Sequence, residues 1–167
     1  ENGETSNTII EGFTITNGYS ALYGGGMYNR YSSPTLTIAH LNTTLLVKLA
    51  VECATVYLVA NAYKLHIREN DAFWSSGGML NTWDSHPTLT NCPFTNNTAL
   101  SGGGMSNSNN SNPTLNTCTF ENNTADNDGG GMYNIGSSFT LTDCIFKSNS
   151  AANYGGGMYN NDSSPTL

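Results

Sequence analysis

Charged residues are scarce in this chain, and cationic ones are the scarcest. Five lysine and arginine residues stand against twelve aspartate and glutamate residues among 167, which gives a formal net charge of −7. Such a chain repels phosphate backbones and anionic lipid, and five cations are too few to form a basic patch. We therefore expect no nucleic-acid partner.

Helical patterning and long apolar runs are lacking as well. No segment of the regular repeats places apolar residues at i, i+3, i+4 and i+7, as an amphipathic helix would. The nearest approach to a long apolar run, Leu45 to Ala60, carries Lys48 and Glu52 and is too short to span a membrane as a helix. The absence of helical patterning excludes helical solenoids.

What the chain has instead is a repeated phrase rich in glycine and asparagine. All five methionines follow glycines, in "GGGM" or once in "SGGM", at spacings of 52, 26, 27 and 26 residues. These residues are Met27, Met79, Met105, Met132 and Met158. Cysteine and phenylalanine, two residues apart, recur on the same period. A fixed period of this length indicates a solenoid in which each repeat contacts only its neighbours.

The short pieces within each repeat have the composition of β-strands. The pieces "TLT", "CTF" and "GMYN" are rich in Thr, aromatic and large apolar residues, and Asn, Ser, Gly and Pro separate them. Three short strands in each repeat of about 26 residues indicate a single-stranded parallel β-helix with coils about 4.8 Å apart. We predict an all-β solenoid of about six coils, with residues 8–29 as a variant first coil in which Ile15 takes the Phe place.

Coils stacked in register place each side chain over its counterpart, so inward positions should form ladders. The methionines should form one ladder, and Cys and Phe share a face because they are two residues apart. The asparagine two residues after each methionine should form an amide ladder at a turn, because asparagine tolerates a left-handed backbone. The triple glycines should supply positive φ at tight corners. The other ladder residues are Cys92, Cys118, Cys144, Phe94, Phe120, Phe146, Asn29, Asn81, Asn107, Asn134 and Asn160.

Two motifs resemble those of a known family. The "GGGMYN" phrase and a Phe-x-x-Asn phrase, in "FTNN", "FENN" and "FKSN", are similar to the repeats of polymorphic outer membrane proteins, known from chlamydial surface proteins. Methionine follows three glycines here, where the family has Gly-Gly-Ala-aliphatic. The resemblance covers nearly the whole chain except residues 37–67. It implies a right-handed β-helix displayed outside the cell, often as an autotransporter passenger.

Residues 38–67 break the repeat. With suitable synonymous codons, shifted reading frames of this stretch encode "GGGM" and "PTLTNCTF" where the period requires them. We therefore expect a frame-shifted or an inserted, aberrant repeat there, forming a distorted coil. Residues 1–167 as a whole are expected to be one β-helix repeat domain, cut from a longer chain at both ends.

Residues that could support metal or redox chemistry are few. His40, His66 and Cys53 belong to the broken repeat, and a metal site needs three or four converging ligands. Asp126 and Asp128 beside a glycine turn are half of a calcium loop. The three repeat cysteines could form a disulfide between coils, but stacked side chains point in parallel, which favours buried free thiols. We predict no metal site beyond that calcium candidate, and no cofactor.

The distribution of acidic residues and tyrosines in the sequence favours binding over catalysis. Glycosidases need a pair of carboxylates, and no acidic residue recurs at coil spacing, so we predict no catalytic residue. Tyr28, Tyr133 and Tyr159 form a column that would point outward and stack on sugars or a partner protein, or else cover a turn.

The expected function is a structural and display segment of an exported bacterial surface protein, adhesin-like, located at the cell surface. Its expected partner is a surface protein or glycan of a host or neighbouring cell. The alternative is a fragment of a β-helical polysaccharide lyase or hydrolase, which a surface cluster of Asp with Arg or Lys would indicate.

Overall fold

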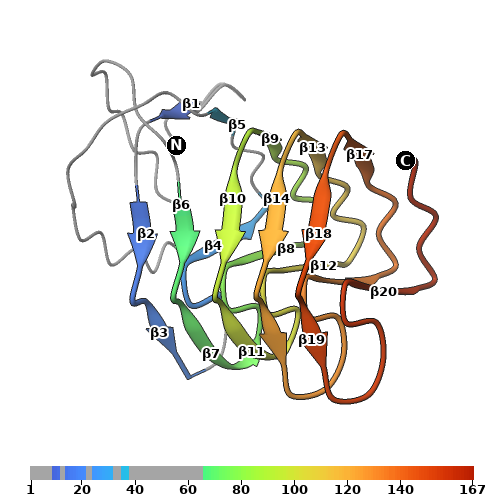
Figure 1. Cartoon of the computed structure of the whole chain (residues 1–167). Coiled ribbons are helices and arrows are strands. Elements are labelled where there is room, and N and C mark those ends of the chain that lie inside the picture. Colours follow the sequence, from blue (N-terminus) through green and yellow to red (C-terminus); the bar gives the residue numbers. More distant parts are fainter. Residues whose placement is uncertain (1–8, 12–13, 22–23, 32–34, 38–65) are drawn as a thin grey trace.

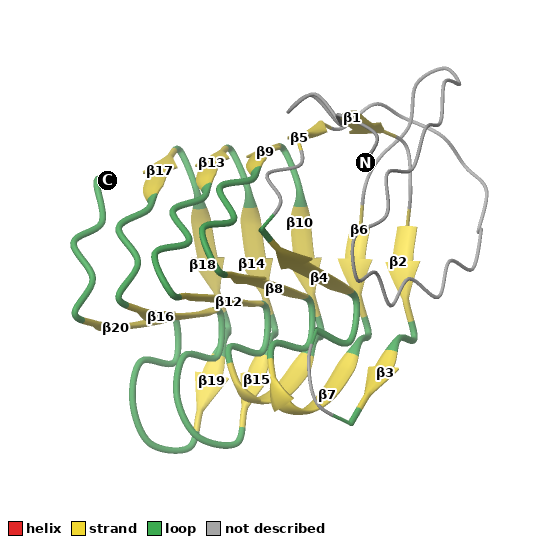
Figure 2. Ribbon diagram, turned by 180° about the vertical axis from the view of Figure 1, so that it is seen from behind, coloured by secondary structure: helices red, strands yellow, loops and turns green. Residues whose placement is uncertain are grey.

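The computed structural model describes residues 9–11, 14–21, 24–31, 35–37 and 66–167. Every regular element in these residues is a β-strand, and the strands form four parallel sheets of five strands each (Figure 1). Seen from behind, the described chain shows only strands and loops, and it contains no helix that could cross a membrane (Figure 2). The predicted all-β parallel β-helix is confirmed.

Each coil adds one strand to every sheet. Sheet A contains β1 (Ile9–Glu11), β5 (Thr35–Thr37), β9 (Thr88–Thr90), β13 (Thr114–Asn116) and β17 (Thr140–Thr142). Sheet B contains β2 (Thr14–Thr16), β6 (His66–Arg68), β10 (Pro93–Thr95), β14 (Thr119–Glu121) and β18 (Ile145–Lys147). Sheet C contains β3 (Tyr19–Ser20), β7 (Asp71–Ser75), β11 (Thr98–Ser101), β15 (Thr124–Ala125) and β19 (Ser150–Ala151). Sheet D contains β4 (Met27–Arg30), β8 (Met79–Thr82), β12 (Met105–Ser108), β16 (Met132–Ile135) and β20 (Met158–Asn161).

A coil has four strands, so the prediction of three strands per repeat was wrong. The additional strand exists because the Phe-x-x-Asn phrase turns a corner between sheets B and C. The residue before the asparagine has a left-handed backbone, as at Asn96 (φ 55°) and Asn122 (φ 54°). One residue in this conformation redirects the chain, and asparagine tolerates it better than most residues. The residues after the corner, such as Thr98–Ser101, then pair as a separate strand.

The number of stacked coils is lower than the predicted six. Strands β2, β3 and β4 pair directly with β6, β7 and β8, so that Asn29 lies beside Asn81 although 52 residues separate them. The 52-residue spacing from Asn29 to Asn81 is therefore a single step in the stack, and the distorted coil predicted for residues 38–67 falls largely outside the described residues. His66 and Ile67 begin the regular strand β6, while residues 38–65 lie outside the described residues.

Columns of like side chains fill the interior. The rings of Phe94 and Phe120 stack with centroids 4.6 Å apart, and Phe146 follows at 4.8 Å. This separation equals the spacing between strands of a sheet, so the rings stack without distorting the coils. Ile67 and Ile15 continue the column in the earlier coils. The fully buried members of the core include Met79, Met105, Met132, Cys92, Cys118, Phe94 and Phe120. The partly buried members are Met27, Met158, Cys144 and Phe146.

An asparagine ladder runs along the inside of sheet D. The side-chain Nδ2 of each residue donates to Oδ1 of the next, over distances of 2.7 to 2.9 Å, through Asn29, Asn81, Asn107, Asn134 and Asn160. We predicted these residues at a left-handed turn, and that is wrong. Each lies at the third position of a strand, and none has a positive φ. Alternation along the strand places asparagine on the same inward face as methionine.

A second amide ladder, at the corner between sheets B and C, was not predicted. It consists of the asparagines of the Phe-x-x-Asn phrase and of the matching position in β6's coil, which are Asn70, Asn97, Asn123 and Asn149. Nδ2 of Asn97 donates to the carbonyl of Ile67 in one neighbouring coil and to Oδ1 of Asn123 in the other, both at 2.9 Å. Its backbone N–H donates to the same Oδ1 at 3.0 Å. The buried amide therefore joins three coils.

In the glycine triplets of the inner coils, glycine is required for two different reasons. The first glycine has a left-handed backbone, as at Gly102 (φ 68°). The third lies where coils approach closely: a Cβ added to Gly104 would lie 2.6 Å from the carbonyl oxygen of Gly131 and 2.8 Å from Cδ1 of Phe120. A real Cβ does not occupy such positions. The glycine phrase and the Phe-x-x-Asn phrase therefore contact each other inside the stack.

Removing one rung of the corner ladder should destabilise the protein strongly. Replacing Asn123→Ala removes the acceptor of two Asn97 donors and the donor to the Phe94 carbonyl. We expect a loss of about 3 kcal/mol, because buried groups are left without partners. Urea unfolding followed by far-ultraviolet circular dichroism measures it. Asn116→Ala, on the partly exposed face of β13, is the control and should change stability by less than about 0.5 kcal/mol. Equal losses in the two variants would contradict the role of the ladder.

The direct pairing of the first two described coils leads to a second prediction. Strand β9 is joined to β10 by Asn91 and Cys92 alone, and β5 and β6 occupy the same places one coil earlier. Replacing residues 38–65 with the dipeptide Asn-Cys should therefore leave the stack folded. A shorter connection costs less closure entropy, so the free energy of unfolding should stay equal or rise by up to about 2 kcal/mol. Urea unfolding tests this, and loss of the cooperative transition would show that residues 38–65 support the stack.

Candidate functional site

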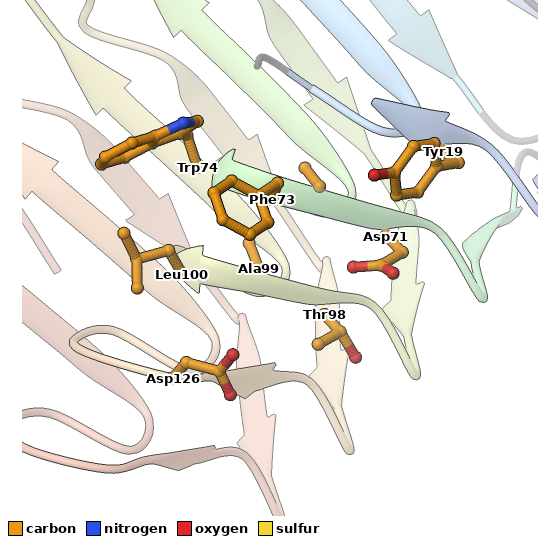
Figure 3. Close-up of a pocket in the computed structure, with 9 residues that line it drawn as sticks. Tyr19, Asp71, Phe73, Trp74, Thr98, Ala99, Leu100 and Asp126 are labelled. Atoms are coloured by element: carbon orange, nitrogen blue, oxygen red, sulfur yellow. The ribbon is translucent and has the colours of Figure 1, made fainter. Parts of the chain in front are cut away.

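A hollow of about 470 Å³ lies over the outer face of sheet C (Figure 3). We call it the sheet C groove. Its lining residues are Tyr19, Asp71, Ala72, Phe73, Trp74, Thr98, Ala99, Leu100 and Asp126. They come from four successive coils, through β3, β7, β11 and the segment after β15. The groove therefore runs along the axis of the stack.

A β-bulge in β7 turns two aromatic residues into the groove. In the pairing of β7 with β11, Phe73 and Trp74 together lie opposite the single residue Leu100. Strict alternation would point one of the two into the core, and a bulge re-aims side chains next to the irregularity. Phe73 is 65% and Trp74 54% exposed, and their rings meet edge to face with centroids 5.7 Å apart. The bulge thus presents an aromatic pair to solvent.

Polar groups lie beside these rings. Tyr19, Asp71 and Thr98 pair in register across three coils, and they form one outward column. Figure 3 shows Trp74, Phe73 and Tyr19 as an upper row, with the Asp71 carboxylate below Tyr19. Asp126 lies at the other end of the groove, near Leu100. The groove thus combines exposed aromatic faces with carboxylate and hydroxyl groups.

This combination suits a neutral, hydroxyl-rich ligand. Exposed aromatic rings pack against apolar faces, while carboxylates accept hydrogen bonds from hydroxyl groups. The described lining has two carboxylates and no lysine or arginine, so an anion would be repelled. A sugar ring offers both an apolar C–H face and peripheral hydroxyl groups. The lining of the groove is therefore chemically compatible with a sugar ring.

The predicted calcium residues lie in different surroundings. Asp126 lines the sheet C groove, whereas Oδ1 of Asp128 accepts the backbone N–H of Tyr154 at 3.1 Å. Across the described ranges, no group of three or more His, Cys, Asp or Glu residues could hold a metal ion. His66 lies in β6, and His40 and Cys53 lie outside the described residues. Calcium at Asp126 and Asp128 stays a prediction.

The predicted tyrosine column is only partly assembled. Tyr133 and Tyr159 stack with centroids 5.4 Å apart, while Tyr28 lies opposite Leu80, further along the stack. Leu80 is 4% exposed, and the next residue in the column, Ser106, is 2% exposed. Burial, the charge of Asp128 and the charge of Tyr159 raise the pKa of Tyr133. Because the two residues between Tyr28 and Tyr133 in this column are buried, the three tyrosines do not form one continuous exposed surface.

The three repeat cysteines form a column of free thiols. The hydrogen bond with Cys144 lowers the pKa of Cys118, but the hydrogen bond with Cys92 and burial raise it, and the net pKa is about 12. The hydrogen bond with Cys118 and burial also raise the pKa of Cys144 well above its usual range. A thiol needs to become a thiolate to act as a nucleophile or a metal ligand. At neutral pH Cys118 and Cys144 therefore keep their protons.

The sheet C groove was missed at the sequence level, although two signals point to it. Met79 follows Ile67 by 12 residues and Met132 follows Phe120 by 12, whereas Met105 follows Phe94 by 11. The coil of β7 is therefore one residue longer than the coil of β11, with which it pairs. After the alanine that all these coils share, the β7 coil reads "FWS", where the later repeats have "LS", "DND" and "ANY". A difference in length of one residue between neighbouring coils, next to two large aromatic residues in a polar repeat, indicates a bulge with an exposed ring pair.

Comparison with known proteins gives one match. A family model described as "Right handed beta helix region" matches residues 52–167, which is more than half of the chain. No curated protein matches the chain. No solved structure matches it either. The family match agrees with the four parallel sheets and supplies the handedness, which the repeat period does not determine.

The thiol column predicts a loss of stability at alkaline pH. The pKa of Cys118 is raised from 9.0 to about 12, so the folded state retains a proton that the unfolded state loses. This contribution is fully present below pH 9.0 and is lost as the pH rises towards the folded value of about 12. Between about pH 8 and 10.5 we expect the free energy of unfolding to fall by about 1 to 2 kcal/mol.

Urea unfolding across this pH range, compared between the native chain and Cys118→Ala, checks the effect. The variant loses packing at every pH, so only the slope of stability against pH is compared. A shallower slope in Cys118→Ala is expected. An identical slope would mean that the thiol column does not cause the alkaline destabilisation.

Proposed function

Because the chain belongs to the right-handed β-helix family, we propose that it is a display and binding segment of an exported bacterial surface protein, whose sheet C groove binds a neutral glycan. The observation that carries this proposal is the aromatic pair Phe73 and Trp74, which a bulge holds in solvent. Exposed rings of this size lose favourable burial unless a ligand covers them. The stack itself provides a rigid support, because each coil is bonded to its neighbours on four sheets.

The finer proposal is that the repeats are of the polymorphic outer membrane protein type. Support comes from the two motifs that resemble that family. Gly104 of the glycine phrase lies against Phe120, and Asn123 of the same Phe-x-x-Asn phrase bonds to the neighbouring coils. The two motifs thus form one packing unit, and methionine fills the core place after the glycines. Location at the cell surface, and a glycan or protein of another cell as the partner, follow as part of this proposal.

A polysaccharide lyase or hydrolase is the second candidate function. The observation in its favour is that Asp71 and Asp126 line the same groove. Strand register places them two coils apart, since β7 pairs with β11 and β11 with β15. Two coil steps are about 10 Å, and Asp126 lies two residues beyond the Thr124 position, so the two backbones are about 12 Å apart. A glycosidase pair needs carboxyl groups about 5 to 9.5 Å apart. The two Asp side chains would have to lean towards each other to reach that range, which makes binding the better fit to the groove.

Binding can be tested with the fluorescence of Trp74. The sequence has two tryptophans, so Trp83→Phe leaves Trp74 as the only one. Short neutral oligosaccharides of glucose, mannose and N-acetylglucosamine are titrated into this variant. We expect saturable quenching with at least one of them, and Phe73→Ala should weaken that binding about fivefold or more, as loss of a central aromatic contact does. Ile145→Ala, an exposed apolar residue on sheet B, is the control and should bind as before. Absence of quenching with every sugar would refute glycan binding in this groove.

The enzyme candidate needs a separate measurement. The protein is incubated with the polysaccharides that correspond to any bound oligosaccharide, and new reducing ends and unsaturated ends are measured. We expect none above the level without protein. If chain ends are released and Asp71→Asn abolishes the release, the groove is an active site, and catalysis replaces display as its function.

A further inference from the structure

A second group of exposed aromatic rings lies outside the sheet C groove, at the corner that follows sheet D. Tyr31 is 62% and Trp83 44% exposed, and their ring centroids are 6.0 Å apart. The guanidinium of Arg30 lies 5.2 Å from the centre of the Tyr31 ring and 5.9 Å from that of Trp83. We call these three residues the corner patch. It combines a cation with two aromatic faces that solvent reaches.

The backbone of the corner patch is strained in a way that the later coils avoid. Tyr31 and Trp83 have φ values of 52° and 56°. The same place in the following three coils is taken by Asn109, Gly136 and Asp162, which share the left-handed conformation. Asparagine, aspartate and glycine tolerate this conformation, whereas a bulky aromatic residue there is an outlier. Strained residues of this kind occur where function requires the side chain.

Arg30 also differs from the other described cations. Arg68 pairs with Glu69 at 3.6 Å, and Lys147 pairs with Glu121 at 2.7 Å. Among the residues that the structure describes, Arg30 is the cation that makes no ion pair. In a chain with a net charge of −7, an exposed guanidinium would be expected to form an ion pair with a carboxylate. The guanidinium of Arg30 instead lies over two aromatic rings. Its donors are available to an anion that comes from outside.

We propose that the corner patch binds a single carboxylate-bearing sugar, such as the acidic end of an otherwise neutral glycan. The sugar ring would stack on Trp83 and Tyr31, and its carboxylate would accept hydrogen bonds from Arg30 in the paired geometry that guanidinium favours. A polymer of acidic sugars fits poorly, because one cation faces it and the net charge of −7 repels it. This site is independent of the sheet C groove, and the proposal does not rest on that groove.

Trp83 can report on this site alone. Trp74→Phe leaves it as the only tryptophan and also alters the sheet C groove, so the two sites are separated. Methyl β-glucuronide and methyl β-glucoside, which differ in one carboxylate, are titrated while Trp83 fluorescence is recorded at low salt. We expect the glucuronide to bind about tenfold more tightly or better, since a charge-assisted pair contributes this much. Equal binding of the two sugars, or no response to either, overturns the proposal.

Charge variants test the role of Arg30. Arg30→Gln should abolish the preference for the glucuronide, while Lys147→Gln, which removes the same charge from a paired surface site, should leave it unchanged. An equal loss in both variants would mean that net charge, and not the corner patch, sets the preference. Polygalacturonate is titrated as well, and binding tighter per sugar than the single glucuronide would contradict a site for one acidic sugar.

A stability measurement separates a binding role from a structural one. Trp83→Asn places in this corner a residue type that the next coil already uses. We expect the melting temperature to rise by roughly 1 to 3 °C, because the strain is relieved, while glucuronide binding measured by calorimetry is lost. A fall in the melting temperature would show that the aromatic pair serves the fold, and it would overturn the proposal.

Discussion

The hydrogen bonds of one buried asparagine per coil hold this solenoid in register. At the corner between sheets B and C, Nδ2 of Asn97 reaches the carbonyl of Ile67 on one side and Oδ1 of Asn123 on the other. An amide can bond in both directions only if its neighbours lie one strand spacing away and directly in line. The same spacing brings the phenylalanine rings to 4.6 and 4.8 Å and leaves no room for a side chain at Gly104. The inward residues are therefore fixed together, and a change in any of them disturbs its neighbours.

Because the inward positions are fixed, the coils differ mainly on their outward faces. At Phe73 and Trp74, strand β7 has one residue more than β11, yet the inward neighbours Ala72 and Ala99 stay paired and buried. In the same way, Tyr31 and Trp83 occupy a left-handed corner where asparagine or glycine would be easier. Both departures lower the stability of the local backbone and increase exposed aromatic area. A residue that lowers stability is retained where its exposed side chain serves a function. The regular strand pairing of the stack tolerates this loss of stability.

The sequence predicted the repeated features well, because stacking turns equal position in the period into contact in space. The methionine, cysteine and phenylalanine columns follow from that rule alone. Features that depend on the local backbone were missed. In "TNN", Asn96 has a left-handed backbone and Asn97 has a buried side chain that forms the second ladder. The repeat period alone does not distinguish these two asparagines. The corner, the fourth strand that follows it and the second ladder were therefore not predicted. The 52-residue spacing from Met27 to Met79 suggested a further coil between them. Backbone hydrogen bonds decide which strands pair, however, and β4 pairs directly with β8. The groove was missed because alternation alone would have buried one ring of the Phe73 and Trp74 pair.

Five of the six exposed aromatic residues lie in the first two described coils, while Tyr154 lies in the last one. This distribution favours different roles for the two ends of the stack. Tyr19 and Tyr31 belong to the first coil, and Phe73, Trp74 and Trp83 belong to the second. The matching outward positions of the third coil hold Thr98, Leu100 and Asn109, which offer little aromatic surface. A binding function spread evenly over the solenoid would repeat its contact residues with the period, as the core does. The residues of the two proposed sites lie mainly at one end, and the more regular coils that follow can serve as a support for them. This arrangement is the one that the proposed binding function of the sheet C groove requires, since its aromatic and carboxylate lining comes mainly from these coils.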